Sequence, residues 1–511
     1  MKKLLPILLF FICILCCNKG FSQANKFPIQ GFHLDLRVQV MKLEALKKFA
    51  KQLHDGGINT LVMEWEATYP FENHPLIANK YAYSREEIVD FITYCEALGI
   101  DVIPLQQSFG HVEYILRHYR YKELREDQKD YSQINPLKEE LAKELFKDLY
   151  RDLISTHNSE YIHIGGDETY LLGHSKESQK KVAELGKGRL YGDYIKLLCE
   201  LVVSLGKRPI VWADIAMKYP DALDGLPKET IFIDWNYGWD VNMFGKHSNL
   251  LNSGFEIWGA PALRSHPDNY FVTQWEKHFN NIKDFIPLAK DFGYNGIIMT
   301  SWSTSGLYSS LWESPKDLVE LYPIRRVYPL NGFNILLEAY FESLKQDGPL
   351  DIKNFVDQYA KNQYGFNAQE SNKFWNALRA NPYEINQGVL SEGGIDIKTM
   401  VDSALWVKNQ LHSLKPKKNK KGYAHYLLMA DIRYDYLRYM DIESRLNSKS
   451  FDSSDSHQII ADLKEIVKSS KDKRFRKLHQ DFLFSAEIRE ENSLRNSKAK
   501  LLYERLTKNS N

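Results

Sequence analysis

The chain has 511 residues, of which 43% are hydrophobic and 13% aromatic, and its formal net charge is +1. A chain of this length and composition can bury a large core, either as two domains or as one large barrel with an appendage. The balanced charge gives no electrostatic reason to expect nucleic acid or an anionic membrane surface as a partner.

The first residues have the pattern of a signal peptide. Two lysines precede an apolar run, and small residues follow up to Ala24. We therefore expect residues 1–24 to be removed and the mature protein to be periplasmic or secreted. A lipid anchor on Cys17 is an alternative. No later run approaches the roughly 20 apolar residues of a membrane span, so we expect no transmembrane helix. Only Cys95 and Cys199 lie beyond this segment, which excludes a disulfide framework and a cysteine zinc site.

Strand-like apolar runs alternate with longer amphipathic segments from Gly31 onward. We count eight such runs, at residues 32–36, 59–63, 101–105, 161–164, 209–213, 230–234, 255–259 and 296–300. A helical pattern is clear at residues 136–154, where Asn135 can cap the helix and Leu137, Leu141, Leu145 and Leu149 share a face. Eight alternating units predict an α/β fold, a (β/α)8 TIM barrel over residues 25–329.

Only helical patterns follow the barrel. Residues 399–414 and 424–446 have apolar positions at helical spacing, which predicts an α-helical C-terminal domain over residues 330–511. The basic run at residues 415–421 contains Pro416 and is expected to be a solvated loop between helices, with polyanion binding as the alternative.

Polar and aromatic residues follow the predicted strands, where a barrel carries its catalytic groups. They are Asp35, Arg37, Glu64, Trp65, Glu66, Gln106, Gln107, His111, Glu113, Asp167, Glu168, Trp212, Asp214, Asp234, Trp235, Tyr237, Trp239 and Trp302. Each could be an ordinary rim residue. Their recurrence at one end of seven strands predicts a site there.

The fourth run ends in two glycines and two adjacent carboxylates, Asp167 and Glu168. Burying two ionised neighbours costs several kcal/mol unless each has a partner, so the pair indicates a functional site. Carboxylates among Trp and Tyr favour glycoside hydrolysis. Because consecutive side chains of a strand diverge, the pair is poorly placed to act as acid and direct nucleophile on one carbon. It better suits a substrate that supplies its own nucleophile.

The segment His163-Ile164-Gly165-Gly166-Asp167-Glu168 resembles the signature of glycoside hydrolase family 20, the β-N-acetylhexosaminidases. Residues 32–37, 61–66, 106–111 and 300–302 are similar to its hexosaminidase D branch, and the resemblance spans residues 30–328. It implies an exo-acting, retaining, substrate-assisted enzyme without a cofactor, acting on glycans with terminal GalNAc or GlcNAc.

The resemblance also implies roles for individual residues. Glu168 matches the general acid/base, and Asp167 the carboxylate that orients the 2-acetamido group and stabilises the oxazolinium intermediate. His111 and Asp35 match a supporting chain behind the acid. Trp302, Trp235 and Trp212 would form walls around the sugar. We also expect Gln107 and Asp214, at the ends of strands three and five, to bind substrate.

The chain departs from the commoner branch of the family at two places. Gln30 stands where that branch has an arginine for sugar hydroxyls, so we expect Glu64, Glu66 or Arg37 to bind them. That branch also has a tyrosine for the acetamide oxygen, and Tyr237 is the candidate here. Two alternatives remain: a metal site at His163, Asp167 and Glu168, disfavoured because no second histidine is spaced to join, and an inactive sugar-binding protein on a glycosidase scaffold.

Overall fold

The computed structural model describes residues 27–265, 268–303, 327–380, 385–386, 389–390 and 396–508. The expected signal peptide, with Cys17, lies outside these ranges. Within them, no helix is both long enough and apolar enough to cross a membrane. Cys95 and Cys199 are buried free thiols.

Eight of the nine strands in the main sheet close into a parallel barrel. They are β1 (Ile29–Asp35), β2 (Thr60–Glu64), β3 (Asp101–Leu105), β4 (Tyr161–His163), β5 (Arg208–Trp212), β6 (Ile231–Trp235), β7 (Glu256–Ala260) and β9 (Gly296–Ser301). The pairing of β9 with β1 completes the circle. Each predicted run overlaps one of these strands, so the (β/α)8 barrel is confirmed.

One short strand was not predicted. β8 (Ala262–Arg264) follows β7 after a single proline and pairs with the end of β9, beyond the closed circle. Three residues after Pro261 are too few to show a period of two, so the sequence carried no signal for this strand.

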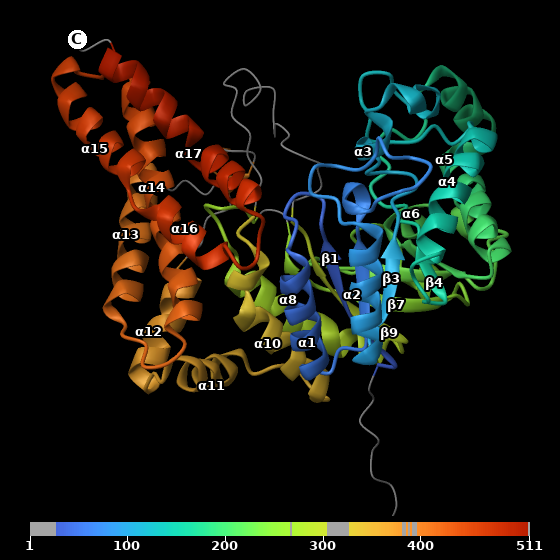
Figure 1. Ribbon diagram of the computed structural model, residues 1–511, viewed down its shortest axis with the longest axis horizontal. Coiled ribbons are helices and arrows are strands. Elements are labelled where there is room, and N and C mark those ends of the chain that lie inside the picture. Colours follow the sequence, from blue (N-terminus) through green and yellow to red (C-terminus); the bar gives the residue numbers. More distant parts are fainter. Residues whose placement is uncertain are drawn as a thin grey trace, which may run out of the picture.

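Helices surround the barrel, as Figure 1 shows. The longer ones are α1 (Leu43–Asp55), α2 (Arg85–Ala97), α4 (Glu139–Ile154), α5 (Lys176–Ser204), α8 (Trp275–Asp291) and α10 (Asn334–Lys345), and the short ones are α3 (Glu113–Leu116), α6 (Asp214–Lys218) and α7 (His247–Leu251). Short 3-10 turns are η1 (Glu66–Thr68), η2 (Tyr119–Leu124), η3 (Pro220–Leu223) and η4 (Leu330–Gly332). Gly186, with φ 83°, interrupts α5.

The predicted start of α4 was wrong by three residues. Asn135 does not cap this helix but accepts from the backbone N–H of Leu137 and donates to Glu177, so the chain turns before the helix begins. Leu141 is 45% exposed, and the buried face contains Ala142, Leu145, Phe146 and Leu149. A strict spacing of four drifts around a helix of 3.6 residues per turn, which explains the exposed leucine.

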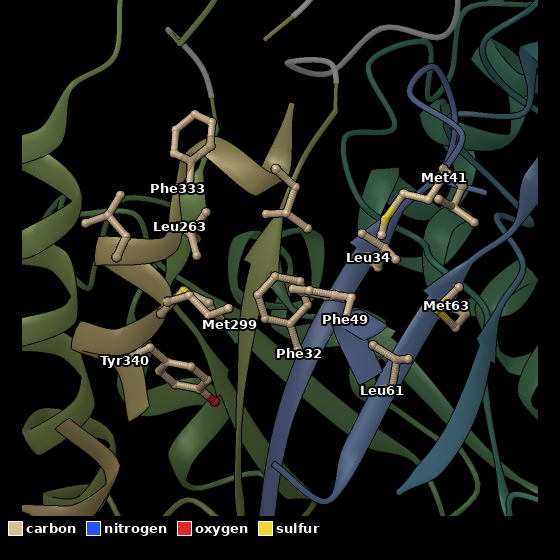
Figure 2. Close-up of a cluster of buried hydrophobic side chains, with 14 of the residues drawn as sticks. Phe32, Leu34, Met41, Phe49, Leu61, Met63, Leu263, Met299, Phe333 and Tyr340 are labelled. Atoms are coloured by element: carbon tan, nitrogen blue, oxygen red, sulfur yellow. The ribbon is translucent and has the colours of Figure 1, made fainter. Parts of the chain in front are cut away.

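The main core lies between the strands and the surrounding helices. Figure 2 shows Phe32 of β1 beside Phe49 of α1, and their ring centroids are 5.1 Å apart. On the other side of β1, the hydroxyl of Tyr340 in α10 donates to the carbonyl of Gly31 at 2.8 Å. α10 thus covers β1 and β9, although it lies beyond the expected boundary at residue 329.

The remaining helices form a second body beside the barrel, at the left of Figure 1. They are α11 (Ile352–Tyr364), α12 (Ala368–Arg379), α13 (Ile397–Ser413), α14 (Lys420–Leu446), α15 (Ser456–Lys468), α16 (Lys471–His479) and α17 (Ser485–Lys508), with the turn η5 (Ser453–Asp455). A two-residue pairing of β10 (Ile385–Asn386) with β11 (Val389–Leu390) interrupts the helices. The expected C-terminal helical region is confirmed, and the basic run at residues 415–421 leads into α14.

A buried polar network joins this helical region to the barrel. Arg264, at the end of β8, donates to Gln39 after β1 at 3.0 Å, to Ser301 of β9 at 2.8 Å and to the carbonyl of Tyr328 at 2.9 Å. The Gln39 amide in turn donates to Glu491 of α17 at 3.5 Å. Loops that begin at the carboxyl ends of β1 and β8 are therefore tied to the last helix.

Candidate active site

The loop after β4 carries the two carboxylates to the carboxyl end of the barrel. Gly165 and Gly166 have φ of 77° and 97°, a left-handed conformation that favours glycine. A Cβ on Gly165 would collide with the side chain of Gln107. The two glycines therefore let the chain turn directly from the strand into Asp167 and Glu168.

His111 joins the two carboxylates. Its Nε2 lies 3.4 Å from an oxygen of Asp167 and 3.3 Å from Oε2 of Glu168. Burial alone would lower the pKa of His111, but the charges and hydrogen bonds of Asp167 and Glu168 raise it well above its ordinary value. The three side chains thus hold an imidazolium between two carboxylates.

Glu168 has partners on both oxygens. Burial raises the pKa of its carboxyl, but the hydrogen bond and charge of His111, with the hydroxyl of Tyr170, lower the pKa overall. The Tyr170 hydroxyl donates to Oε1 at 2.7 Å. His111 and Tyr170 thus favour the ionised form of Glu168 in the free protein, and the imidazolium of His111 carries a proton that can be transferred to it.

Backbone strain is concentrated here. Glu66, His111 and Glu168 have φ of 46°, 56° and 47°, in the left-handed region that non-glycine residues rarely adopt. Such residues cost about 1–3 kcal/mol each and persist where the surrounding structure enforces them. Three loops are therefore held in unfavourable conformations that present these side chains to one site.

Asp214, at the start of α6, holds the backbone of the acid. Its Oδ2 accepts from the N–H of Glu168 at 3.2 Å, and its Oδ1 accepts from the indole of Trp235 at 3.3 Å. Burial and the charge of Asp167 raise the pKa of Asp214 to about 7. Its position next to Glu168 agrees with the expected site, although its contacts are with the protein.

Asp35 lies elsewhere than expected. Its carboxylate accepts from the backbone N–H of Arg37 at 2.7 Å and of Ser303 at 2.9 Å, and it lies 3.3 Å from the Arg37 guanidinium. Within the described chain no hydrogen bond or ion pair joins Asp35 to His111. Of the two residues expected to support the acid, His111 contacts it directly, whereas Asp35 bonds to the loops after β1 and β9.

The guanidinium of Arg37 lies close to three buried carboxyl groups. Its Nε lies 3.3 Å from Asp35, 3.8 Å from Glu64 and 3.7 Å from Glu66. Glu64 is already occupied, since it pairs with His33 at 2.9 Å and accepts from Gln107 at 3.0 Å. Its pKa is lowered, despite the cost of burial, by Arg37 and His33.

Glu66 differs from Glu64, because both of its oxygens are buried without a hydrogen bond in the described chain. Burial raises the pKa of Glu66 well above its ordinary value. Nη1 of Arg37 and Oε1 of Gln107 are also buried and unpaired. Buried polar groups are normally satisfied, so these atoms are suited to a ligand rich in hydroxyl groups.

Aromatic rings line the other part of the site. The indole of Trp302 donates to the Tyr237 hydroxyl at 2.8 Å, and its ring lies 6.0 Å from Trp212 and 4.5 Å from His33. Trp212 is only 1% exposed, below this layer. Trp235 contacts Tyr237, Trp239 and Phe244 at centroid distances of 5.2, 5.4 and 4.5 Å. The predicted aromatic residues therefore form one connected group.

Two predicted strand-end residues lie away from the site. Trp65 donates to His157 at 3.0 Å and packs against Tyr83, so it belongs to the helical layer. Asp234 pairs with His247 at 3.0 Å. Successive side chains of a strand point to opposite faces, so Trp65 points outward because its neighbour Glu64 points into the barrel.

Sequence reasoning missed two polar residues of the site: Tyr170, which binds the acid, and His33, which binds Glu64. Glu113, which follows the third predicted strand, has one buried oxygen without a hydrogen-bond partner in the described chain. Burial raises the pKa of Glu113. The position of His33 two residues before Asp35 placed it on the same strand face, which is the one signal that could have found it.

The metal alternative is disfavoured by the donor set. Ligand atoms of His111, Asp167 and Glu168 lie within 4.8 Å of one another, a group without His163. His163 instead accepts from the N–H of Gly165 and packs its ring 4.4 Å from Trp212.

Comparison with known proteins identifies the same region. Residues 37–306 match the model of the Glycosyl hydrolase family 20 catalytic domain. Hexosaminidase D of Homo sapiens is 27% identical over 340 residues, 63% of this chain and 70% of the relative. Hexosaminidase D of Bos taurus is 28% identical over 297 residues, 55% of this chain and 86% of the relative. The crystal structure of a β-N-acetylhexosaminidase from Bacteroides fragilis has a TM-score of 0.50, at 18% identity, over 66% of this chain and 70% of that one, which supports the fold.

Proposed function

The chain belongs to glycosyl hydrolase family 20 and is a glycoside hydrolase, and we propose that it is an exo-acting, retaining β-N-acetylhexosaminidase. In this proposal it removes terminal GalNAc or GlcNAc from glycans by substrate assistance. The observation that carries the proposal is the buried contact of His111 with both Asp167 and Glu168. That contact gives two adjacent carboxylates different tasks.

Glu168 acts first as the acid. When a saccharide covers the site and removes water, the proton on His111 moves to Oε2 of Glu168, 3.3 Å away. The ion pair thereby becomes a neutral pair, which is favoured as the surroundings become less polar. Glu168 then protonates the glycosidic oxygen as the bond from that oxygen to the anomeric carbon breaks.

Asp167 orients the acetamide group that acts as the nucleophile. Its Oδ1 is buried and has no hydrogen-bond partner in the described chain, so it is free to accept from the acetamide N–H. The acetamide oxygen attacks the anomeric carbon and forms an oxazolinium ion, whose positive charge the Asp167 carboxylate stabilises. Water, deprotonated by Glu168, then opens this ring from the opposite face, and two inversions give net retention.

Tyr237 is suited to the acetamide oxygen. An indole N–H is only a donor, so Tyr237 accepts from Trp302 and keeps its own proton, which Thr300 or the acetamide oxygen can accept. Trp302 and Trp235 would enclose the acetamide and sugar ring, while Arg37, Glu66 and Gln107 supply the unpaired atoms for hydroxyl groups. Trp212 would support this layer from below, since it is almost fully buried.

The test combines an aryl N-acetyl-β-hexosaminide with a cyclic thiazoline that mimics the oxazolinium ion. We expect release of the aryl alcohol and competitive inhibition by the thiazoline. Turnover that ignores the thiazoline would contradict substrate assistance. Binding of the sugar without any aryl release would instead favour an inactive sugar-binding protein. Parallel assays with the galactosaminide and the glucosaminide then define the accepted sugar.

We also propose that the chain is exported, on the basis of residues 1–24. Sequencing the N-terminus of the protein recovered from the cell envelope tests this, because cleavage near Ala24 supports a secreted form. A blocked N-terminus at Cys17 would show a lipoprotein, and an intact Met1 would contradict export.

A further inference from the structure

A second pocket opens beside Glu168, away from the group around Arg37. It holds a cavity of about 190 Å³ that opens to solvent. Its lining comes from the loop after β4, the kinked α5, α6 and the loop before α7: Glu168, Thr169, Tyr170, Leu172, Lys187, Asp214, Ile215, Lys218, Tyr219 and Phe244.

The position of this pocket identifies which part of a substrate it can hold. Glu168 lines it, whereas Asp167, Arg37 and Trp302 do not. In the proposed mechanism the acid reaches the oxygen between the cleaved sugar and the leaving group. A pocket that reaches Glu168 but not the acetamide carboxylate therefore lies on the leaving-group side of the bond.

Aromatic faces continue from the active site into the pocket. Phe244 lies 4.5 Å from the ring of Trp235, whose indole binds Asp214. Tyr170 is 80% exposed although its hydroxyl donates to Glu168, so its ring faces solvent directly beside the acid. Exposed aromatic rings of this kind can stack on the apolar face of a sugar.

The outer part of the pocket carries two unneutralised positive charges. Lys187 follows the break of α5 at Gly186, and Lys218 ends α6. In the described chain neither ammonium has a carboxylate within 4.0 Å, and Lys218 lies 5.5 Å from the ring of Tyr219.

Two acids, Glu168 and Asp214, also line the pocket at its inner end, so the positive charge is confined to the side of Lys187 and Lys218. Glu168 is bound by His111 and Tyr170, and Asp214 by Trp235 and the Glu168 backbone.

We propose that this pocket is a leaving-group subsite for an acidic saccharide, in which Lys187 and Lys218 bind a carboxylate or sulfate of the sugar released by cleavage. The inference rests on the proposed function, since it uses Glu168 as the acid that protonates the leaving oxygen. It defines the substrate class as an N-acetylhexosamine linked to an anionic sugar.

The experiment compares three oligosaccharides that share one terminal N-acetylhexosamine, linked to a uronic acid, to a sulfated hexose or to the corresponding neutral hexose. The wild-type enzyme should have a higher kcat/KM for an acidic substrate than for the neutral one. Exposed ion pairs change binding by up to about five-fold each, so the preference should reach about ten-fold and weaken as salt is added. Whichever acidic arm is preferred identifies carboxylate or sulfate.

The variants are Lys187→Gln, Lys218→Gln and the double variant, with Lys180→Gln on the exposed face of α5 as the matched control. The acidic-to-neutral ratio of kcat/KM should fall toward one in the double variant and stay unchanged in Lys180→Gln. A ratio reports specificity and is independent of the fraction of folded enzyme.

The assays distinguish a failure of the proposed function from a failure of the proposed subsite. If the wild type cleaves no aryl N-acetyl-β-hexosaminide, the proposed function fails. If it cleaves the aryl substrate but shows no preference for either acidic oligosaccharide, or a preference that survives the double variant, the subsite is wrong while the function stands.

Discussion

In the proposed mechanism Glu168 is an anion at rest and an acid during turnover, and a single proton shared with His111 accounts for both states. We expect Glu168→Gln to lower kcat by about 10²- to 10⁴-fold for substrates with a poor leaving group. The loss should be smaller for an aryl group that leaves without protonation. Measuring kcat across aryl leaving groups of graded pKa checks this, with the exposed Glu140→Gln as control. An equal loss for every leaving group would show that Glu168 has another role.

The raised pKa of Asp214 predicts how the stability of the folded protein changes with pH. Its folded pKa of about 7 lies above the roughly 3.9 of an unfolded Asp, a difference on the order of 4 kcal/mol. As pH rises between these values the unfolded chain loses this proton before the folded chain does, so the folded state loses stability. Above about pH 7 the loss is complete.

Asp214→Asn removes this contribution, while its side-chain oxygen can still accept from the Glu168 N–H. We expect the Tm of the wild type to fall more between about pH 5 and pH 8 than the Tm of Asp214→Asn. Calorimetry at both pH values measures the difference, with the exposed Asp224→Asn as control. If the Tm of the wild type and of Asp214→Asn fell equally between these pH values, the raised pKa of Asp214 would be contradicted.

At the scale of elements, the three-residue strand β8 positions a buried arginine that joins several loops. Arg264 is buried at its end and donates to Gln39, Ser301 and Tyr328. Arg264→Gln should lower the free energy of unfolding by on the order of 3 kcal/mol, since several buried acceptors lose their donor. It should also raise KM, because the loop that carries Asp35 and Arg37 loses its support.

Chemical denaturation and steady-state kinetics measure these two effects. Arg189→Gln is the control, because Arg189 pairs with Asp193 on the surface and exposed pairs contribute about 1 kcal/mol or less. A stable Arg264→Gln variant with unchanged KM would show that the network does not hold the loop.

The sequence predicted the elements whose signals are local. Each of the eight barrel strands was marked by an apolar run, and seven of the strand ends carried polar or aromatic residues into the next loop. β8 was missed because three residues show no periodicity. The contacts of Asp35 could not be predicted, because the paths of the loops after β1 and β9 decide whether its carboxylate reaches His111 or Ser303. The binding of Tyr170 to Glu168 likewise depends on a turn within one loop.

At the scale of the whole molecule, the barrel and the helical region share a packed interface. Phe271, in the loop before α8, stacks on Tyr436 of α14 with centroids 3.7 Å apart, and Trp275 contacts Tyr426 at 5.6 Å. We expect one calorimetric transition for the wild type. Phe271→Ala should lower Tm, since such truncations cost about 3–5 kcal/mol, and should separate the transition into two.

Phe451→Ala, in the partly buried outer cluster near α15, is the matched control for this substitution. It should lower Tm less and leave the transition single. Two transitions in the wild type would show that the barrel and the helical region unfold independently.

The hydrogen bond from Gln39 to Glu491 spans 452 residues of sequence. During synthesis, the loop that follows the first strand must therefore wait for almost the entire remaining chain before its last buried partner exists. An unfinished or partly unfolded chain would present Asp167 and Glu168 without the completed loop that holds Arg37. We therefore expect this loop to reach its final conformation only after the last helix has docked.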